Sequence, residues 1–530
     1  MTYTSFVFLI FLLITGIFYY IVPKKAQWVV LLIASLVFYF FSSQFLGVFI
    51  VLSALLIYLG ARQIQKYGDE FKLKKKGLER AERKELKAKT QKKQKAVLTT
   101  VVVLNIAALA ALKYCNFFGD IINGISHLFG GGKLIPMFSV VLPLGISYYT
   151  LMAVSYIVDV YRGTIQAEKN PFRLLLFLSY FPHISEGPFD RYGDMDKQFR
   201  EPHYLDFDVI KNGGILMMYG FFKKLVIADR LGFIVNGIFD NADILSGTSI
   251  LIGILGYTLQ LYCDFSGCID IVSGVSEMFG VKLAENFRQP FFSRSINEFW
   301  RRWHITLGLW LKEYVFYPVS LSNNFKKVNA SCRKHIKNEF LTGMIPAAYA
   351  LFFVWFCNGL WHGASGKYIF YGLYYYILMM LGEFTKPLTD KLCTKIKLNR
   401  DTKWYHGFQI FRTFVIVNVG MLIFRSATLA DSWHYLAQLF TTRPNFVELF
   451  NDTIKIPHIS NKDYALLVVA TIAIYVIGKL KENGHDIRLE LSQKNLVFRW
   501  LIYLVLMFTV IITGFYGGAF GDAGMIYGQF

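Results

Sequence analysis

Residues 340–382 read FLTGMIPAAYALFFVWFCNGLWHGASGKYIFYGLYYYILMMLG and contain one formal charge, Lys367. A helix needs about 20 predominantly apolar residues to cross a bilayer, so this stretch predicts membrane-spanning structure. His362 lies inside it, in the motif NGLWHG (358–363). An ionisable side chain at membrane depth is costly and usually marks a functional site. The alternative, which the stretch alone leaves open, is a histidine that reaches the interface or bonds a neighbouring helix.

The rest of the chain repeats this pattern of apolar runs separated by short charged loops. Of the 530 residues, 54% are hydrophobic and 17% aromatic, and the mean hydropathy is +0.40. This composition predicts an all-α polytopic membrane protein and excludes soluble multidomain classes. Some of the apolar runs are expected to be re-entrant. The runs lie near residues 3–22, 27–42, 44–61, 96–115, 136–160, 171–188, 212–238, 248–272, 341–358, 360–382, 407–426, 463–480 and 498–518.

The net charge of +20 is concentrated in the loops beside these runs. The positive-inside rule explains such a distribution better than a nucleic-acid partner does. Residues 62–95 carry fourteen Lys and Arg against five Asp and Glu, so we expect a cytoplasmic insertion that lies against anionic headgroups. The basic segments 326–337 and 386–403 then also lie inside, and 427–462 lies outside. We expect one membrane domain, residues 1–530, as a multi-pass protein of the plasma or inner membrane.

Residues 297–314 form a second stretch that is rich in charged, polar and aromatic side chains. On a helix, one stripe would contain Trp300, Trp303, Leu307, Trp310 and Tyr314. His304 would flank that stripe, next to Trp300. The stretch therefore predicts an interfacial amphipathic helix, and Arg301 and Arg302 are as well explained by anchoring at the headgroups as by a ligand. Interfacial anchoring does not explain an imidazole.

Two further clusters combine acidic, basic and imidazole side chains beside glycine and proline. Residues 262–267 contain Asp264, and residues 181–192 contain His183, Glu186 and Asp190. Each is as well explained by a structural ion pair between helix ends as by a role in a pocket. For Asp264, the sequence does not identify the basic partner that such a pair needs.

Several familiar catalytic motifs are missing from the sequence, among them the Gly-x-Ser-x-Gly elbow, the phosphate-binding loop and His-Glu-x-x-His. The six cysteines form no Cys-x-x-Cys pair, and we expect them to pack in the core and bind no metal. The sequence therefore offers histidine side chains without an obvious protein nucleophile. This combination suits general-base activation of a hydroxyl. Loop charges place residues 297–314 toward the cytoplasm. They place the glycines of 359–366 toward the outer half, where a broken or re-entrant helix is expected.

These motifs together resemble the membrane-bound O-acyltransferase (MBOAT) family. The resemblance rests on ENFRQP (285–290), RSI (294–296), FWRRWHITL (299–307) and GLWHGA (359–364), with supporting matches at 142–150, 222–230 and 262–267. The motifs cover a core of about residues 140–370. Within this family, the sequence resembles the bacterial branch that contains the alginate O-acetylation membrane subunit and the teichoic-acid D-alanylation membrane protein. The Arg301-Arg302 pair and the ending IYGQF (526–530) resemble the former, and 184–192 resembles the latter.

The resemblance implies a ring of tilted helices around a thinned, funnel-shaped centre with a tunnel. In it, His362 matches the catalytic histidine and His304 a second functional position. The acyl donor would be a cytoplasmic thioester, acetyl-CoA or an acyl carrier protein, used as a substrate with no resident cofactor. The acceptor would be an extracytoplasmic polysaccharide, reached through an SGNH-type acyltransferase or an anchored partner. Candidate donor and tunnel residues are Asn358, Trp361, Trp300, Arg301, Arg302, Trp303, Lys312 and Asp264.

A neutral imidazole with a pKa of about 6.5 can take the hydroxyl proton as the oxygen attacks the thioester, and burial favours that neutral form. We expect the acyl group to be acetyl. Three alternatives stay open at this point: D-alanyl transfer onto teichoic acid, a non-enzymatic transporter or flippase, and a scaffold that only docks a secreted partner.

Overall fold

The computed structural model describes residues 1–138, 140–445, 447–449, 454 and 456–516. The ending 526–530 therefore lies outside the described residues. Contacts group the chain into two compact units, the first made of Met1–Gly213 with Val272–Ala284, the second of Gly214–Ile271 with the chain from Glu285 onward. The described part is helical, with one isolated antiparallel bridge between Phe287 and Trp303. The expected ring and its tunnel concern both units together and stay predictions.

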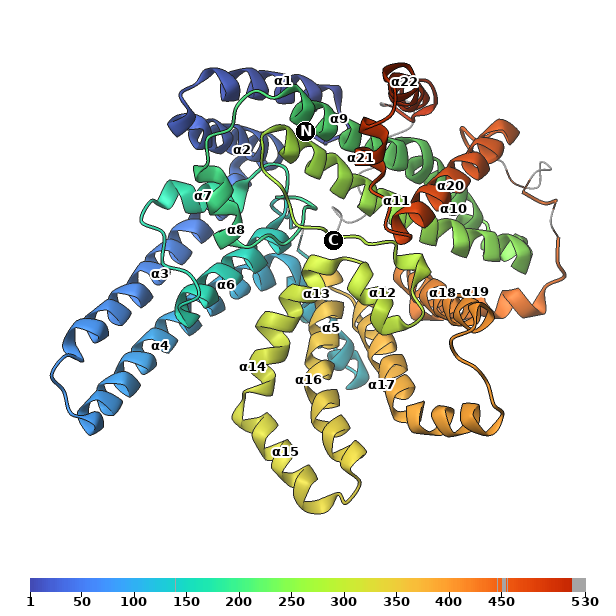
Figure 1. Ribbon diagram of the computed structural model, residues 1–530. Coiled ribbons are helices and arrows are strands. Elements are labelled where there is room, and N and C mark those ends of the chain that lie inside the picture. Colours follow the sequence, from blue (N-terminus) through green and yellow to red (C-terminus); the bar gives the residue numbers. More distant parts are fainter. Residues whose placement is uncertain (139, 446, 450–453, 455, 517–530) are drawn as a thin grey trace. The chain divides into compact units, whose positions relative to one another are not determined.

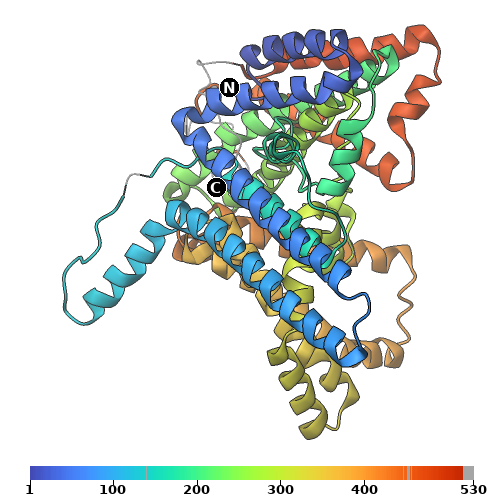
Figure 2. The ribbon, with the colours of Figure 1, turned by 90° about the vertical axis from the view of Figure 1, so that its left-hand side faces the viewer.

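The first unit is built around two long antiparallel helices, α3 (Val48–Lys74) and α4 (Arg80–Lys113), which lie side by side in Figure 2. The basic segment 62–95 forms the end of this hairpin, and Glu79 and Glu82 make a capping box where α4 begins. At 1.5 Å per residue, the 34 residues of α4 extend about 51 Å, beyond the ~30 Å of a hydrocarbon core. The other helices are α1 (Phe6–Ile21), α2 (Gln27–Ser43), α5 (Cys115–Leu128), α6 (Ile146–Arg162), α7 (Pro171–Ser179) and α8 (Tyr192–Arg200).

The chain passes between the units within α9 (Phe207–Phe221) and within α11 (Gly247–Met278). In the second unit, α9 continues without a break through a π-helical segment (η3, Phe222–Ala228) into α10 (Asp229–Asp240). The later helices are α12 (Ile296–Arg302), α13 (Ile305–Leu311), a second π segment (η6, Lys312–Phe316), α14 (Tyr317–Ser320), α15 (Asn323–His335), α16 (Glu339–His362), α17 (Gly366–Lys395), α18 (Lys403–Arg425), α19 (Leu429–Thr441), α20 (Asn461–Glu482), α21 (Ile487–Ser492) and α22 (Leu496–Thr513).

The prediction of an all-α polytopic membrane protein is confirmed. Among the residues searched, seven helical stretches are long and apolar enough to cross a membrane, and Phe6–Ile21 is a shorter apolar helix. These stretches are Lys24–Lys74, Arg80–Lys113, Gly247–Met278, Glu339–His362, Lys403–Arg425, Asn461–Glu482 and Leu496–Thr513. They contain five of the predicted runs whole (27–42, 44–61, 248–272, 341–358 and 463–480) and most of 96–115, 407–426 and 498–518, of which residues 517–518 lie outside the described part. Runs 27–42 and 44–61 are joined in the first stretch.

The predicted helix over 171–188 is wrong, because α7 ends at Ser179 and the chain continues in buried turns to 191. Pro182 and Pro188 lack the backbone donor that a helix needs. The run at 136–160 becomes helical only from Ile146, and its residue 139 lies outside the described part. The helix that covers the run at 360–382 begins only at Gly366 and continues to Lys395, beyond the apolar run and into the charged residues that follow it.

Helices α16 and α17 form a hairpin that brings two backbones unusually close (Figure 1). A Cβ atom added at Gly359 would lie 2.4 Å from the carbonyl oxygen of Tyr368, and one at Gly372 would lie 2.3 Å from that of Trp355. Small residues allow this approach between helices in a membrane. The expected break falls after His362, where α16 ends, and Gly359 stays inside the helix. The hairpin therefore fixes the position of His362.

Candidate functional site

The stretch 297–314 is not one helix. It divides into α12 and α13, between which Trp303 is extended and His304 has a left-handed backbone with φ 48° and ψ 52°. Left-handed geometry is uncommon outside glycine and persists only where the surrounding structure enforces it. The predicted continuous amphipathic helix is therefore wrong, and the break falls at the histidine.

Backbone pairing with residues 286–288 causes the break. Arg288 donates its backbone N–H to the carbonyl of Arg302 at 2.9 Å, and Ile305 donates to the carbonyl of Asn286 at 3.0 Å. The bridge between Phe287 and Trp303 lies between these bonds. Trp303 still donates its backbone N–H to the Phe299 carbonyl at 2.8 Å, but Ile305 bonds Asn286, nineteen residues earlier, in place of a helical partner. No local helix pattern reveals this pairing.

The side chain of Asn286 orients the imidazole of His304. Its Oδ1 accepts the backbone N–H of Thr306 at 3.1 Å and the Thr306 hydroxyl at 2.9 Å, and lies 3.2 Å from His304 Nδ1. An amide oxygen only accepts, so Nδ1 is the nitrogen that carries the proton. In the neutral ring the lone pair is then on Nε2.

His304 is 2% exposed. Burial lowers the pKa of His304 well below its ordinary value of 6.5, and the nearby His362 lowers it further. Both causes disfavour the charged ring. His304 is therefore a neutral imidazole near neutral pH, with a fixed tautomer.

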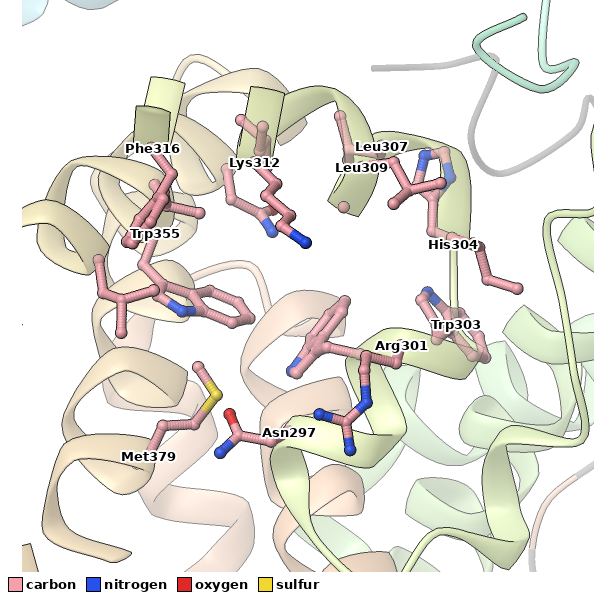
Figure 3. Close-up of a pocket in the computed structure, with 17 residues that line it drawn as sticks. Asn297, Arg301, Trp303, His304, Leu307, Leu309, Lys312, Phe316, Trp355 and Met379 are labelled. Atoms are coloured by element: carbon pink, nitrogen blue, oxygen red, sulfur yellow. The ribbon is translucent and has the colours of Figure 1, made fainter. Parts of the chain in front are cut away.

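A cavity of about 490 Å³ opens beside α12, α13 and α16 (Figure 3). Figure 3 shows Arg301 entering it from α12 and Lys312 from the π segment η6. Its walls are mainly apolar and aromatic. The lining residues that the sequence singled out are Trp300, Arg301, Trp303, His304, Lys312 and Asn358.

Arg302 is not among the residues that line this cavity. Its guanidinium donates to Glu298 at 2.6 Å and to Glu482 at 2.6 Å and 3.0 Å, so two carboxylates hold it. The adjacent Arg301 is exposed at the cavity. The pair therefore divides its roles: Arg302 ties α12 to α20, and Arg301 carries the accessible charge.

Trp300 packs against aromatic rings from two other helices. Its ring centroid lies 5.2 Å from that of Trp355 on α16, and 4.9 Å and 6.3 Å from those of Tyr375 and Tyr371 on α17. Tyr371 in turn lies 5.7 Å from the His362 ring. One continuous aromatic wall therefore leads from the cavity to the second histidine.

His362 is 2% exposed and lies one turn beyond Asn358, on the same face of α16. The Trp361 ring lies 4.9 Å from that of His362 and 5.5 Å from that of His304, so a single indole contacts both imidazoles. Asn358 is 6% exposed, and its Oδ1 is buried without a hydrogen-bond partner at the cavity wall. His362 and Trp361 thus lie behind the lining, and Asn358 reaches it.

Asp264 has the basic partner that the sequence did not identify. Lys224 of the π segment η3 lies 2.6 Å from Asp264 and 2.8 Å from Asp229, and Asp264 is fully buried. Asp264 does not line the cavity, although the adjacent Phe265 packs edge-on against the His304 ring at 4.8 Å. Lys223 pairs with Asp270 at 2.7 Å. The contacts of Asp264 are those of a structural ion pair.

The cluster at 181–192 lies in the first unit and is also engaged in structure. His183 Nδ1 lies 3.3 Å from Asp190 Oδ2, and His183 Nε2 lies 2.8 Å from the Phe177 carbonyl. Asp190 also accepts the backbone N–H of Ala284 at 2.9 Å. These bonds hold the turns that follow α7.

Sequence reasoning missed Asn286, Trp355, Tyr371 and Tyr375 as parts of the site. Asn286 was visible only as a letter of the ENFRQP motif, and its role depends on contacts with residues eighteen and twenty positions later. The three aromatic residues look like ordinary membrane-helix residues in the sequence. Their helical spacing on α16 and α17 gave no separate signal.

Comparison with known proteins identifies the family of the chain. The model of the "MBOAT, membrane-bound O-acyltransferase family" matches residues 165–331, a range that contains His304 and ends before His362. The "Probable alginate O-acetylase AlgI" of Azotobacter vinelandii is 34% identical over 382 residues, 72% of this chain and 69% of that protein. The "Peptidoglycan O-acetyltransferase" of Helicobacter pylori is 30% identical over 359 residues, 62% of each chain.

The "Teichoic acid D-alanyltransferase" of Bacillus subtilis is 34% identical over 289 residues, 53% of this chain and 68% of that protein. The Azotobacter vinelandii and Bacillus subtilis proteins carry the names of the two branches that the motifs indicated, and the names of all three relatives describe acyl transfer. The chain therefore belongs to the membrane-bound O-acyltransferase family, as a multi-pass membrane acyltransferase.

Proposed function

We propose that this protein moves an acyl group, acetyl, from a cytoplasmic thioester across the membrane to an acceptor hydroxyl, for O-acylation of an extracytoplasmic polysaccharide, with His362 as the general base. The observation that carries the proposal is the position of His362 directly behind the cavity wall, on the same helix face as Asn358, which lines the cavity. Asn358 reaches the cavity wall, His362 follows one turn later, and Trp361 joins both imidazoles. An apolar cavity with a few placed polar groups is the usual form of a small-molecule site.

The chemical step needs no protein nucleophile. The acceptor oxygen forms a bond to the acyl carbon while the carbon–sulfur bond breaks, and the sulfur leaves as a thiolate. His362 takes the hydroxyl proton and returns it to the thiolate, so the ring is unchanged after one cycle. His304, neutral and with its tautomer fixed by Asn286, assists by accepting a hydrogen bond at Nε2.

The donor's acyl arm occupies the cavity, and the cations at its edge attract the donor's phosphates. Acetyl-CoA and a carrier-protein thioester both bear phosphate, so Arg301 and Lys312 serve either one. Asp264 and Arg302, also candidates from the sequence, contribute through the ion pairs that hold the surrounding helices. The donor enters as a substrate, with no resident cofactor.

Substitution of both Arg301 and Lys312 by Gln is expected to raise KM for the thioester by about thirtyfold while kcat changes little, since each of the two cations near the phosphates contributes on the order of 1 kcal/mol. Steady-state kinetics of thiol release from purified protein measures both constants. Arg333→Gln with Lys334→Gln, two exposed residues of α15, removes the same charge away from the cavity. An unchanged KM in the cavity variant would refute a donor role for these cations.

Substitution of Asn286 by Ala is expected to lower kcat by about ten- to hundredfold, a part of the 10²–10⁴ that a positioned acid–base group contributes. The reason is that His304 loses its fixed tautomer. Asn286→Asp places a carboxylate beside Nδ1, which stabilises the charged ring and raises the pKa of His304. The acid limb of the pH–activity profile should then move to higher pH.

A purely structural role for Asn286 would lower the activity of the Asp variant at every pH without moving that limb. Asn105, a buried amide of α4 that bonds Ser53 and the Val101 carbonyl, offers a matched control. Asn105→Asp also buries a new carboxylate, but beside the Ser53 hydroxyl and the Val101 carbonyl, where Asn105 forms its hydrogen bonds, and not in hydrogen-bond contact with an imidazole. It should leave the shape of the pH profile unchanged.

D-alanyl transfer onto teichoic acid is the second candidate, and the similarity to the Bacillus subtilis enzyme favours it. To distinguish the two functions, detergent-purified protein is supplied with either labelled acetyl-CoA or a labelled D-alanyl carrier thioester, and ester formation is followed. Acetyl transfer supports the first proposal, and D-alanyl transfer alone would replace it. In vesicles, donor supplied at the basic face and ester recovered at the opposite face would establish transfer across the inner membrane.

The acceptor side is proposed to include an SGNH-type acyltransferase or an anchored partner that passes the acyl group to the polysaccharide. The transporter alternative predicts substrate movement without ester formation, which family membership disfavours. The scaffold alternative predicts that glycan acylation survives loss of His362.

A further inference from the structure

A second cavity of about 550 Å³ lies in the second unit, apart from the one assigned to the donor. Its walls come from α9, the loop 285–289, the end of α20, α21 and α22. One part of the lining is apolar and contains Ile215, Leu216, Ile477, Leu491, Ile502 and Leu506. Another part is charged and polar, and contains Glu285, Arg288, Lys481, His485, Asp486 and Arg488.

The two parts differ in their place along the membrane-spanning helices. Ile477 lies inside α20 and Leu506 lies inside α22, and both helices are long and apolar enough to cross the membrane. Lys481 lies in the last turn of α20, and Arg488 lies in the link to α22. The apolar residues of α20 and α22 therefore lie at hydrocarbon depth, and the basic part lies at headgroup level. The positive-inside rule makes this end cytoplasmic.

The charges of the lining favour an anionic occupant. Three basic side chains face two acidic ones, and Arg288 holds one of the acids, Glu285, in an exposed ion pair. The other acid, Asp486, accepts the backbone N–H of Leu489 as the cap of α21. Lys481 lies 5.6 Å from the ring of Tyr219, which also lines the cavity. Lys481 and Arg488 both line the cavity and carry the positive charge that a phosphate would meet there.

We propose that this cavity binds an anionic phospholipid of the surrounding membrane, with its phosphate at Lys481 and Arg488 and part of an acyl chain against Ile502 and Leu506. Only an amphiphile satisfies both parts of the lining at once. Basic pockets between membrane helices on the cytoplasmic side are suited to acidic headgroups.

The site also adjoins the segment that holds His304. Phe287 lines the cavity, and its ring lies 5.1 Å from that of Trp303 and 5.0 Å from that of Phe265. Glu482, next to Lys481, binds Arg302 of α12. A lipid in the cavity thereby supports the wall that positions the candidate catalytic segment.

Native mass spectrometry of the full chain in detergent tests the proposal, with phosphatidylglycerol and phosphatidylcholine of identical acyl chains as probes. The wild-type protein should retain phosphatidylglycerol about tenfold more than phosphatidylcholine, and Lys481→Gln with Arg488→Gln should lower that preference to about twofold. Lys326→Gln with Lys327→Gln, exposed on α15, removes equal charge elsewhere and should leave the preference intact. Equal retention of both lipids by the wild type would overturn the proposal.

Two further measurements separate the lipid from other anions. Ile502→Trp fills the apolar part with every charge in place, and should lower retention of phosphatidylglycerol while the thermal midpoint without lipid stays within a few degrees. Inorganic phosphate and adenosine 3′,5′-bisphosphate are the soluble probes. If either displaces phosphatidylglycerol at millimolar concentration, the cavity is a site for a soluble phosphate and the proposal fails. Because all readouts are of binding, their outcome is independent of the donor cavity.

Discussion

Substitution of His362 by Ala is expected to lower acyl transfer by at least about a hundredfold, since a positioned general base contributes 10²–10⁴ in rate. His362 is buried in a pocket of rings, and no other residue on its face of α16 carries an imidazole. The loss should appear in kcat, because the donor cavity is lined by other side chains. Thiol release from the thioester measures the step in detergent, and ester on the surface glycan measures it in cells.

The loss must be separated from a disturbance of packing. The His362 ring lies 5.3 Å from that of Phe424 and 5.7 Å from that of Tyr371, so Ala leaves a gap there. His362→Gln keeps most of the volume and a polar end, and should be as inactive as Ala while unfolding closer to the wild type. His434→Ala, exposed on α19, serves as the control histidine and should keep full activity. Undiminished acylation by the His362 variants would sink the catalytic assignment.

His304→Ala is the informative partner of this variant. If His304 only positions the donor or the transferred proton, the loss of His304 should lower kcat less than the loss of His362 does. Equal losses, with no further loss in the double variant, would show that the two imidazoles act as a unit. Their shared contact with Trp361 makes such coupling measurable.

Substitution of Lys224 by Met is expected to lower the free energy of unfolding by about 3–5 kcal/mol, the usual cost of removing one partner from a buried ion pair. Asp264 and Asp229 both lose their cation, and Asp264 has no exposed surface at which water can replace it. Thermal unfolding in detergent, followed by tryptophan fluorescence, measures the change. Lys89→Met removes a lysine from an exposed pair with Glu85 and should shift the midpoint by little.

The double variant Lys224→Met with Asp264→Asn removes one of the stranded charges and should recover part of the lost stability. Asp264→Asn alone also decides between the two roles that the sequence left open for this residue. A donor or tunnel role predicts lost acyl transfer at unchanged stability. The observed contacts predict lower stability, with activity retained in the molecules that stay folded. If the double variant is no more stable than Lys224→Met alone, the ion-pair account is contradicted.

The sequence predicted the features that depend on neighbours within a few residues. Apolar length predicted the membrane helices, including α16, which carries His362. The glycines around 363 predicted where that helix stops. Each of these follows from helical geometry and the membrane alone.

The features that the sequence did not predict depend on pairs far apart in the chain. The helix break at His304 requires Asn286, the partner of Asp264 is forty residues earlier, and Arg302 binds an acid 180 residues later. Such pairings compete with local helix formation and leave no periodic signal in a single sequence. The separation of Arg301 from Arg302 is the clearest case, since adjacent identical residues acquire different roles.

The π segment η3 gives this helix one spare residue. A π turn accommodates one residue more than an α turn, so removal of one residue between 225 and 228 would return the segment to ordinary α geometry and leave the later residues of the helix on their present faces. Asp229 would then stay beside Lys224, and Arg230 would stay beside Asp463, which it now meets at 2.8 Å. Outside the π segment, a deletion would rotate every later residue of the helix by about 100°, the angle per residue of an α-helix. A deletion of a single residue should therefore be tolerated inside η3 and be damaging in the α-helical parts that flank it.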